Sequence, residues 1–158
     1  MSPTTKSRSK PIVYLDNCVF NRPYDDQRSI EIRLESEAKL FIQQKIKNGD
    51  LELVWSYILE FENANNPFRL RREAILYWKI IASRCIVQNE RILNQAEKLR
   101  QIGLKSADAL HIACAIEARS DFFLTTDRGI LRKMREHPQI SVLNPIEFVM
   151  LLGEPDDY

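Results

Sequence analysis

Two short apolar runs, far apart in the chain, each stop at an aspartate. Residues 12–15 (IVYL) are followed by Asp16, and residues 122–125 (FFLT) lead to Asp127. Such runs are typical of buried strands in a parallel sheet, whose carboxyl ends lie at one edge. Open α/β sheets bind ligands at that edge, so both acids are expected in a site there. Asp127 is equally well placed to cap a helix over residues 128–135.

A third acid, Asp108, lies at the start of an expected helix. This helix carries Ala109, Ile112, Ala113 and Ile116 at three- and four-residue spacing, which gives one narrow apolar face. Carboxylates that converge without cations repel one another and lose hydration, so their convergence is costly. A divalent metal ion would remove that cost.

Strand and helix patterns alternate along the whole chain. The fold class is therefore α/β: a three-layer α/β/α domain with a parallel sheet of four or five strands, joined by right-handed crossovers. Further strands are expected at residues 51–55, 85–87 and 140–143, and residues 17–28 are expected to form a loop.

Several turn and cap signals bound the expected helices. Ser56 and Asn144 are expected N-caps, and Gly49 and Gly103 are expected helix stops. The apolar spacing predicts inward faces in three helices, made of Ile30, Leu34, Ala38 and Phe41; of Leu70, Ala74, Tyr77 and Ile81; and of Ile92, Leu93, Ala96 and Leu99.

Composition limits the class of protein. The 158 residues, 44% hydrophobic and 28% charged, predict one domain over residues 11–153, between a basic flexible tail (1–10) and an acidic tail (154–158). A net charge of +1 does not by itself indicate nucleic acid. No signal peptide or membrane span is expected. Three cysteines without CxxC spacing predict reduced thiols in a cytoplasmic protein, and two histidines argue against a zinc site.

Four segments together resemble the PIN-domain family of metal-dependent nucleases, which includes the VapC-like toxins of toxin–antitoxin pairs. They are YLDNCV around Asp16, SYILEFE ending at Glu62, SADALHIACA around Asp108 and DFFLTTD ending at Asp127. The resemblance implies that these four acids bind one or two Mg²⁺ or Mn²⁺ ions and that the protein is an endoribonuclease. Glu60 is the alternative to Glu62, and Asp121 is the weaker substitute for Asp127.

The resemblance also directs attention to residues around the acids. Where many family members have a small hydroxyl residue after the first aspartate, this chain has Asn17. Thr125 or Thr126 could orient a ligand or stabilise the strand, and His111 is expected to be a satisfied, half-buried histidine. Candidate contacts to RNA phosphates are Arg22, Lys105, Arg128 and Arg72, and Phe20 and Tyr24 are candidates for base stacking or for packing.

The expected substrate is RNA, and an antitoxin protein and a homodimer are the expected partners to test. Two alternatives stay open. A noncatalytic PIN-like binding or assembly module would keep the sheet without needing all four acids. A phosphatase of another doubly wound family would use Asp16 as nucleophile, but such families usually carry a second aspartate where this chain has Cys18.

Overall fold

A five-stranded, wholly parallel sheet forms the centre of the protein. The computed structural model of the chain describes residues 10–153. The strands run in the order β3-β2-β1-β4-β5, so that the first strand of the chain is the middle one. Their bounds are β1 Ile12–Leu15, β2 Glu52–Ser56, β3 Arg84–Ile86, β4 Phe122–Leu124 and β5 Ser141–Leu143.

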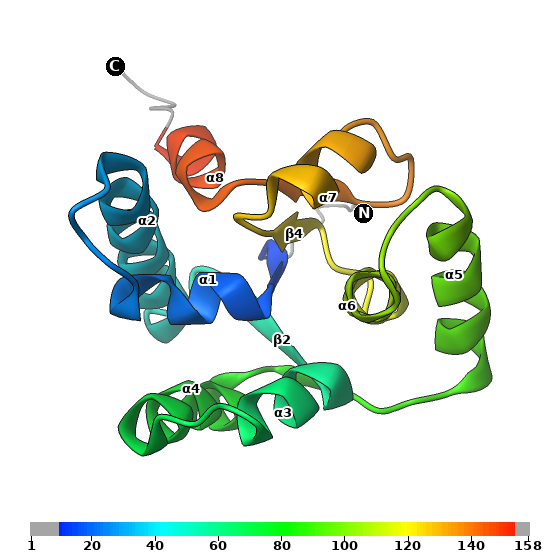
Figure 1. The fold of residues 1–158 in the computed structure, drawn as a ribbon, viewed down its shortest axis with the longest axis horizontal. Helices are drawn as coiled ribbons and strands as arrows, with labels where there is room; N and C mark the ends of the chain where they lie inside the picture. The colour runs from blue at the N-terminus through cyan, green and yellow to red at the C-terminus, as the bar shows by residue number, and fades with distance from the viewer. Residues whose placement is uncertain (1–9, 154–158) are drawn as a thin grey trace, which may run out of the picture.

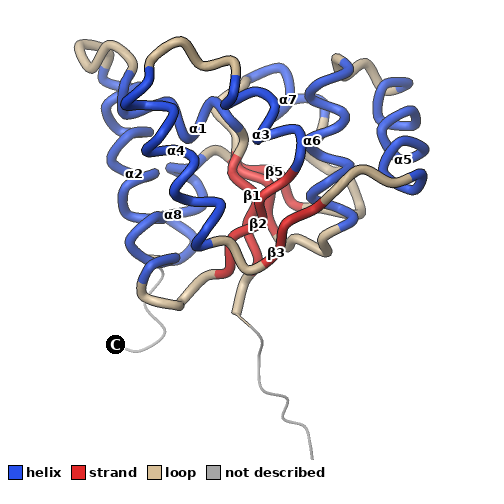
Figure 2. Tube along the Cα trace, turned by 90° about the horizontal axis from the view of Figure 1, so that it is seen from below, coloured by secondary structure: helices blue, strands red, loops and turns tan. Residues whose placement is uncertain are grey.

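Helices cover both faces of the sheet (Figure 1). On one side lie α1, α2, α4 and α8, and on the other lie α5 and α6, as Figure 2 also shows. The helices are α1 Asn17–Asn21, η1 Arg22–Tyr24 (a 3₁₀ turn), α2 Ile30–Lys47, α3 Tyr57–Ala64, α4 Arg69–Ile81, α5 Glu90–Gln101, α6 Ser106–Glu117, α7 Arg128–Lys133 and α8 Pro145–Leu152. The predicted three-layer α/β/α class is confirmed.

The core is built around β1. All four residues of this strand are buried because helices cover both faces and strands cover both sides. Tyr14 stacks on Phe123 of β4, with ring centroids 5.2 Å apart. Phe20, just after the strand, packs edge-on against Trp55 of β2. These contacts fix the carboxyl end of β1, where Asp16 begins the next element.

The expected loop over residues 17–28 is wrong in its first half. Asp16 accepts the backbone N–H of Asn17 and caps the short helix α1, which buries Val19 and Phe20. The 3₁₀ turn η1 follows, with a proline in its first turn. The segment folds as a helix because Val19 and Phe20, three and four residues after Asp16, are both buried in the core. A helical turn brings two side chains at this spacing to the same side of the chain.

The three expected inward faces are also wrong in part. In α2, Ile30, Leu34 and Phe41 are exposed, and the buried face includes Glu35 and Ser36 beside Ala38. Glu35 accepts hydrogen bonds from Arg22 at 2.8 Å and from Asn144 at 2.6 Å. Burial of these polar groups is possible because each has a partner across the interface.

In α4 the predicted inward face is wrong because the helix is rotated about its axis relative to the prediction. Leu70 is 82% exposed and Tyr77 is 49% exposed, whereas Ile75 and Trp78 are buried. In α5 the expected face is confirmed except for Leu93, which is exposed.

The cap and stop signals are confirmed. Ser56 accepts the N–H of Leu59, and Asn144 forms a reciprocal capping box with Glu147. Gly49 and Gly103 have φ values of 83° and 102°, which are left-handed conformations that favour glycine.

The three cysteines are free thiols. Among the described residues, no helix has the length and apolar character needed to cross a membrane. The predicted tails, apart from Lys10, lie outside the described residues.

Candidate active site

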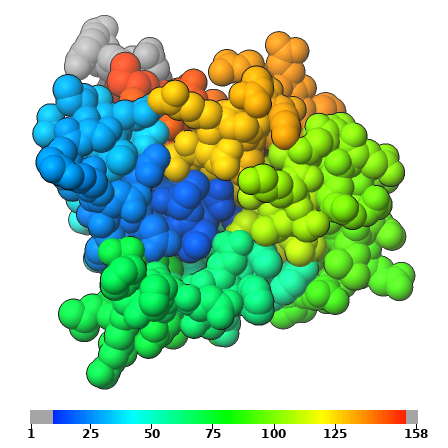
Figure 3. All heavy atoms as spheres, viewed as in Figure 1, coloured from blue at the N-terminus to red at the C-terminus, as the bar shows by residue number. Residues whose placement is uncertain are grey.

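The four predicted acids come from four elements that meet at the carboxyl edge of the sheet. Asp16 follows β1, Asp127 follows β4, Asp108 is in the first turn of α6, and Glu62 is in α3, the helix after β2. In Figure 2, α1, α3, α6 and α7 gather at the same end of the sheet. Figure 3 shows these segments bordering one another on one face of the molecule. This arrangement follows from parallel strands, each of which delivers its next helix to one edge.

Asp16 is the buried centre of the group, with 6% of its surface exposed. Its Oδ1 accepts the N–H of Asn17 at 2.8 Å, and its Oδ2 accepts the hydroxyl of Thr125 at 2.8 Å. The thiol of Cys18 also points to Oδ2, at 3.4 Å. Burial, together with the charge of Asp16, raises the pKa of Cys18 to about 12, so this thiol stays protonated and acts as a donor.

Thr125 connects two of the acids. Besides donating to Asp16, its Oγ1 accepts the backbone N–H of Asp127 at 3.1 Å. The side chain of Asp127 accepts the N–H of Ile130 at 3.0 Å and so caps α7. Asp127 is nevertheless exposed, and its cap uses one oxygen. The capping role and the site role predicted for Asp127 are therefore compatible.

Glu62 is tied to the group through His111. Nε2 of His111 lies 2.8 Å from Oε1 of Glu62 and 4.0 Å from Oδ1 of Asp16. Glu60, two residues earlier, turns away: it pairs with Lys79 at 2.8 Å and accepts the indole N–H of Trp55 at 3.3 Å. Of the two alternative acids, Glu62 is the one directed to the edge.

Asp108 is partly buried and has like charges around it. Its pKa is raised by burial and by the charges of Asp16 and Asp127, and His111 and Lys105 offset only part of this effect. The electrostatic cost anticipated for converging carboxylates therefore falls on Asp108. Burial alone would lower the pKa of His111, but its hydrogen bond to Glu62 and the charges of Asp16, Glu62 and Asp108 raise it.

The raised pKa of Asp108 has a consequence for stability in the absence of metal. The folded protein holds this proton to higher pH than the unfolded chain does, so ionisation of Asp108 lowers stability as pH rises through its folded-state pKa. We expect Asp108→Asn to raise the melting temperature at pH 7 in EDTA. The gain should shrink toward zero as pH falls below the ordinary aspartate range. A gain that is the same at pH 7 and at pH 3 would show that the charge of Asp108 is not its cause.

The donors fit a hard divalent cation in chemical type. Mg²⁺ takes oxygen ligands, keeps several waters and is often held by only one or two carboxylates. Within residues 10–153, no three His, Cys, Asp or Glu side chains are grouped tightly enough to form a ready-made metal cage. Burial is the largest cause of the raised pKa of Asp108, and the charges of Asp16 and Asp127 add to it; a positive charge at this edge would favour the ionised carboxylate, which favours a cation here.

Other predicted residues lie elsewhere. Asp121 accepts the N–H of Ile12, the first residue of β1, and so lies at the opposite, amino edge of the sheet. Phe20 is fully buried, which makes its role packing. Tyr24 is partly exposed, and the guanidinium of Arg71 lies over its ring at 4.8 Å.

The predicted phosphate contacts differ in whether their side chains already bind other groups of the protein. Arg22 is bound to Asp25 and Glu35, and Arg72 donates to the carbonyl of Asn66. Arg128 is exposed and pairs with Glu31 at 2.7 Å. Lys105 is exposed at the N-terminus of α6 and forms no ion pair within residues 10–153.

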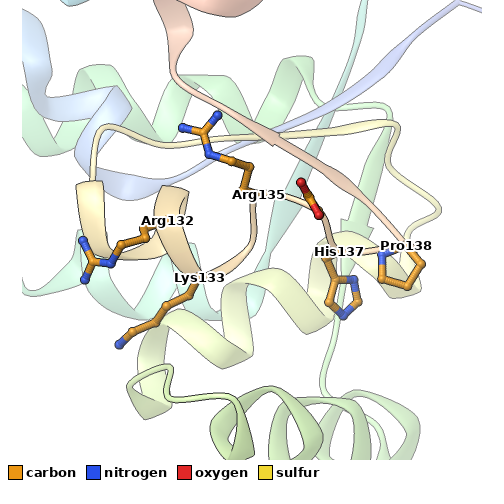
Figure 4. A pocket seen from close by; sticks show the side chains of 6 residues that line it. Arg132, Lys133, Arg135, His137 and Pro138 are labelled. Carbon is orange, nitrogen blue, oxygen red and sulfur yellow. The ribbon is translucent and has the colours of Figure 1, made fainter.

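Further cations lie along α7 and were not predicted. Arg132 and Lys133 are exposed one turn after Arg128, and Lys133 donates to the carbonyl of Gly103 at 2.7 Å. Figure 4 shows Arg132 and Lys133 extending away from Arg135 around a hollow of about 470 Å³. Because these side chains diverge, they form a basic surface rather than a single anion pocket. The four-residue spacing from Arg128 to Arg132 was the available sequence signal.

The fold and the acids define a class: an α/β protein with four carboxylates at the carboxyl edge of a parallel sheet. Residues 13–136 match the family model described as the PIN domain. The chain therefore belongs to the PIN-domain family, as its sequence resemblance indicated. Membership sets aside the phosphatase alternative.

A solved structure shares this fold. It is described as VapBC2 from Rickettsia felis bound to a DNA fragment from their promoter. It matches with a TM-score of 0.52 and 14% identity, over 84% of this chain and 98% of that chain. At that identity the likeness concerns the fold alone. No curated protein matches the chain significantly in sequence.

Proposed function

We propose that this protein is a Mg²⁺- or Mn²⁺-dependent endoribonuclease that hydrolyses RNA phosphodiester bonds. Asp16, Glu62, Asp108 and Asp127 are the catalytic and metal-binding residues in this proposal. The observation that carries it is the gathering of these acids at one edge in a member of the PIN-domain family, where burial and, beside it, the charges of Asp16 and Asp127 raise the pKa of Asp108. A noncatalytic module would have no need for this electrostatic cost.

Each residue has a distinct part in the proposed chemistry. A bound divalent ion would polarise the scissile phosphate and make a water molecule more acidic, so no protein nucleophile is required. Asp16, held by Thr125 and Asn17, supplies a fixed carboxylate at the centre. Asp127 is the most exposed of the four acids, whereas Asp108 and Glu62 are partly buried, so RNA would approach from the Asp127 side.

The direct test uses matched substrates. The purified protein is incubated with a single-stranded RNA and with DNA of the same sequence, in Mn²⁺ and in EDTA. We expect cleavage of the RNA in Mn²⁺ only. Cleavage that persists in EDTA would contradict the metal requirement, and equal cleavage of DNA would contradict the assignment to RNA, which differs by its 2′-hydroxyls.

RNA would reach the acids over a basic surface beside them. We assign phosphate contacts to Lys105 and Arg132, which are exposed near α6 and α7, and to Arg128, which would exchange its solvent-exposed ion pair with Glu31 for a phosphate. Arg22 is instead committed to Asp25 and Glu35, and Arg72 to a backbone carbonyl. Contacts of this kind provide affinity without sequence selection.

The salt dependence of binding tests this assignment. For single-stranded RNA, each neutralised cation should lower the slope of log affinity against log salt by about 0.7 in magnitude. We expect this change for Lys105→Gln and for Arg132→Gln, measured in Ca²⁺ to slow turnover. Arg69→Gln is the matched control, since Arg69 already pairs with Glu73 at 3.0 Å. Slopes that stay unchanged in both test variants would place the RNA path elsewhere.

We further propose that the protein is a cytoplasmic toxin with an antitoxin partner. The described neighbour is a VapBC2 structure, which supports this kind of partner, and the three free thiols fit a reducing compartment. The experiment is co-expression with the product of the adjacent gene, followed by size-exclusion chromatography. A stable complex with suppressed RNA cleavage is expected, and the same column reports whether the chain alone is a dimer.

A further inference from the structure

A continuous chain of buried hydrogen bonds runs beneath the acid edge. The Oγ of Ser56, which accepts the N–H of Leu59 at 3.2 Å, lies 2.6 Å from the hydroxyl of Tyr14. That hydroxyl lies 2.6 Å from Nδ1 of His111, and Nε2 of His111 lies 2.8 Å from Glu62. Ser56, Tyr14 and His111 are each at most 1% exposed. The chain thus links β2, β1, α6 and α3, and it ends on a site acid.

The directions of these hydrogen bonds agree with one another. With a neutral imidazole, Ser56 donates to Tyr14, Tyr14 donates to Nδ1, and Nε2–H donates to Glu62. With a doubly protonated imidazole, Nδ1–H donates to Tyr14, which donates to Ser56, and Nε2–H still donates to Glu62. The other neutral tautomer would set the lone pair of Nε2 against the carboxylate. The bond to Glu62 therefore has the same direction in both favourable protonation states.

Glu62 needs an anchor of this kind. Its side chain is 26% exposed and belongs to the short helix α3, so it could otherwise turn toward solvent. His111 is rigid because it is buried and because Tyr14 fixes its ring. Its Nε2 is also 4.0 Å from Asp16. The nitrogen that binds Glu62 therefore also lies near Asp16, at a distance too long for a hydrogen bond, so the bond to His111 keeps Glu62 on the Asp16 side.

We propose that His111 is a positioning residue, oriented by Tyr14 and Ser56, that holds the carboxylate of Glu62 beside Asp16. It does not contact RNA. The effects expected of His111 on metal binding and on RNA cleavage rest on the proposed nuclease function. The hydrogen-bonded coupling of His111 to Glu62 is a property of the protein alone and can be measured without metal or RNA.

The coupling is tested first, in EDTA, by thermal melts of a double-mutant cycle. His111→Ala and Glu62→Ala are compared with the double variant. We expect the double variant to lose less melting temperature than the two single losses together, because each single variant already breaks the same bond. The pair His111→Ala and Glu60→Ala is the matched control and should be additive, since Glu60 pairs with Lys79. Additive losses for His111 and Glu62 would overturn the proposal.

The consequence for the site is tested by Mn²⁺ calorimetry and by steady-state kinetics. Residues that hydrogen-bond a metal ligand typically contribute 10- to 100-fold to metal affinity or activity. We expect His111→Ala to weaken Mn²⁺ binding by about 10- to 100-fold and to lower kcat with little change in KM. His111→Gln keeps an N–H donor in a similar position and should recover most of the affinity. If the Ala and Gln variants bind Mn²⁺ equally well, the donor at position 111 has no positioning role.

A second variant covers the case in which His111→Ala does not fold. Tyr14→Phe removes only the hydroxyl that fixes the imidazole, and we expect a smaller loss of Mn²⁺ affinity in the same direction. Wild-type affinity in a folded Tyr14→Phe variant would then count against the proposal. If the wild-type protein itself binds no Mn²⁺ while the melting cycle is non-additive, the nuclease proposal fails and the positioning of Glu62 by His111 stands.

Discussion

We expect Asp16→Asn to abolish metal-dependent RNA cleavage while leaving the protein folded. Loss of a metal ligand removes several kcal/mol of transition-state stabilisation, and each ~1.4 kcal/mol is a factor of ten in rate, so the loss should exceed about a hundredfold. The asparagine oxygen can still accept the N–H of Asn17 and cap α1, and its amide can donate to Thr125. The substitution also removes a charge that raises the pKa of Asp108.

The melting temperature separates this result from misfolding. In EDTA, Asp16→Asn should melt at or slightly above the wild-type temperature, and Mn²⁺ should raise the melting temperature of the wild type only. Asp16→Ala is the informative companion, because it also loses the cap and should cost about 1 kcal/mol of stability. A folded Asp16→Asn protein that cleaves within threefold of the wild-type rate would contradict the assignment of Asp16.

We expect Glu62→Gln to reduce cleavage by about a hundredfold or more, and Glu60→Gln to leave it within about twofold of wild type. The two glutamates lie two residues apart in α3, and side chains at that spacing on a helix point about 200° apart. Only Glu62 is bound to His111, at 2.8 Å, beside Asp16. Glu60 pairs with Lys79, which lowers its pKa, and it has no contact with the other site acids.

This pair of variants is an internal control, since both remove one charge from the same short helix. Single-turnover cleavage rates in saturating Mn²⁺ are the measurement, with melting temperatures recorded alongside. If Glu60→Gln were the inactive variant, the direction of α3 described for the site would be wrong. If neither variant lost activity, Glu62 would have no part in the chemistry.

The positions of Asp16 and Asp127 could be predicted from the sequence by local rules, whereas Glu62 was preferred to Glu60 only from the family resemblance. Asp16 and Asp127 end apolar strands, and parallel strands must bring such residues to one edge. Ser56 and Asn144 were recognisable as caps for a similar reason, since a cap depends on residues within one turn. Each of these predictions depends on residues that are close together in the sequence, so contacts with distant elements do not change it.

The errors arose where a distant partner decides the outcome. Glu35 is buried in α2 because Arg22 and Asn144 supply donors from other elements, which no helical periodicity reveals. Arg22 looked like a free phosphate contact for the same reason. His111 was expected to be half-buried and satisfied; it is satisfied, but its partners Tyr14 and Glu62 come from β1 and α3 and it is fully buried. A histidine one turn after Asp108 is visible in sequence, whereas the chain of bonds through it is not.

We expect the acid edge to bind a divalent metal ion through Asp16. Isothermal calorimetry of Mn²⁺ into the wild-type protein and into Asp16→Asn tests this without any assumption about the substrate. We expect saturable binding to the wild type and at least a hundredfold weaker binding to Asp16→Asn, with both proteins folded. Equal affinity in the two proteins, or no binding to the wild type, would contradict it.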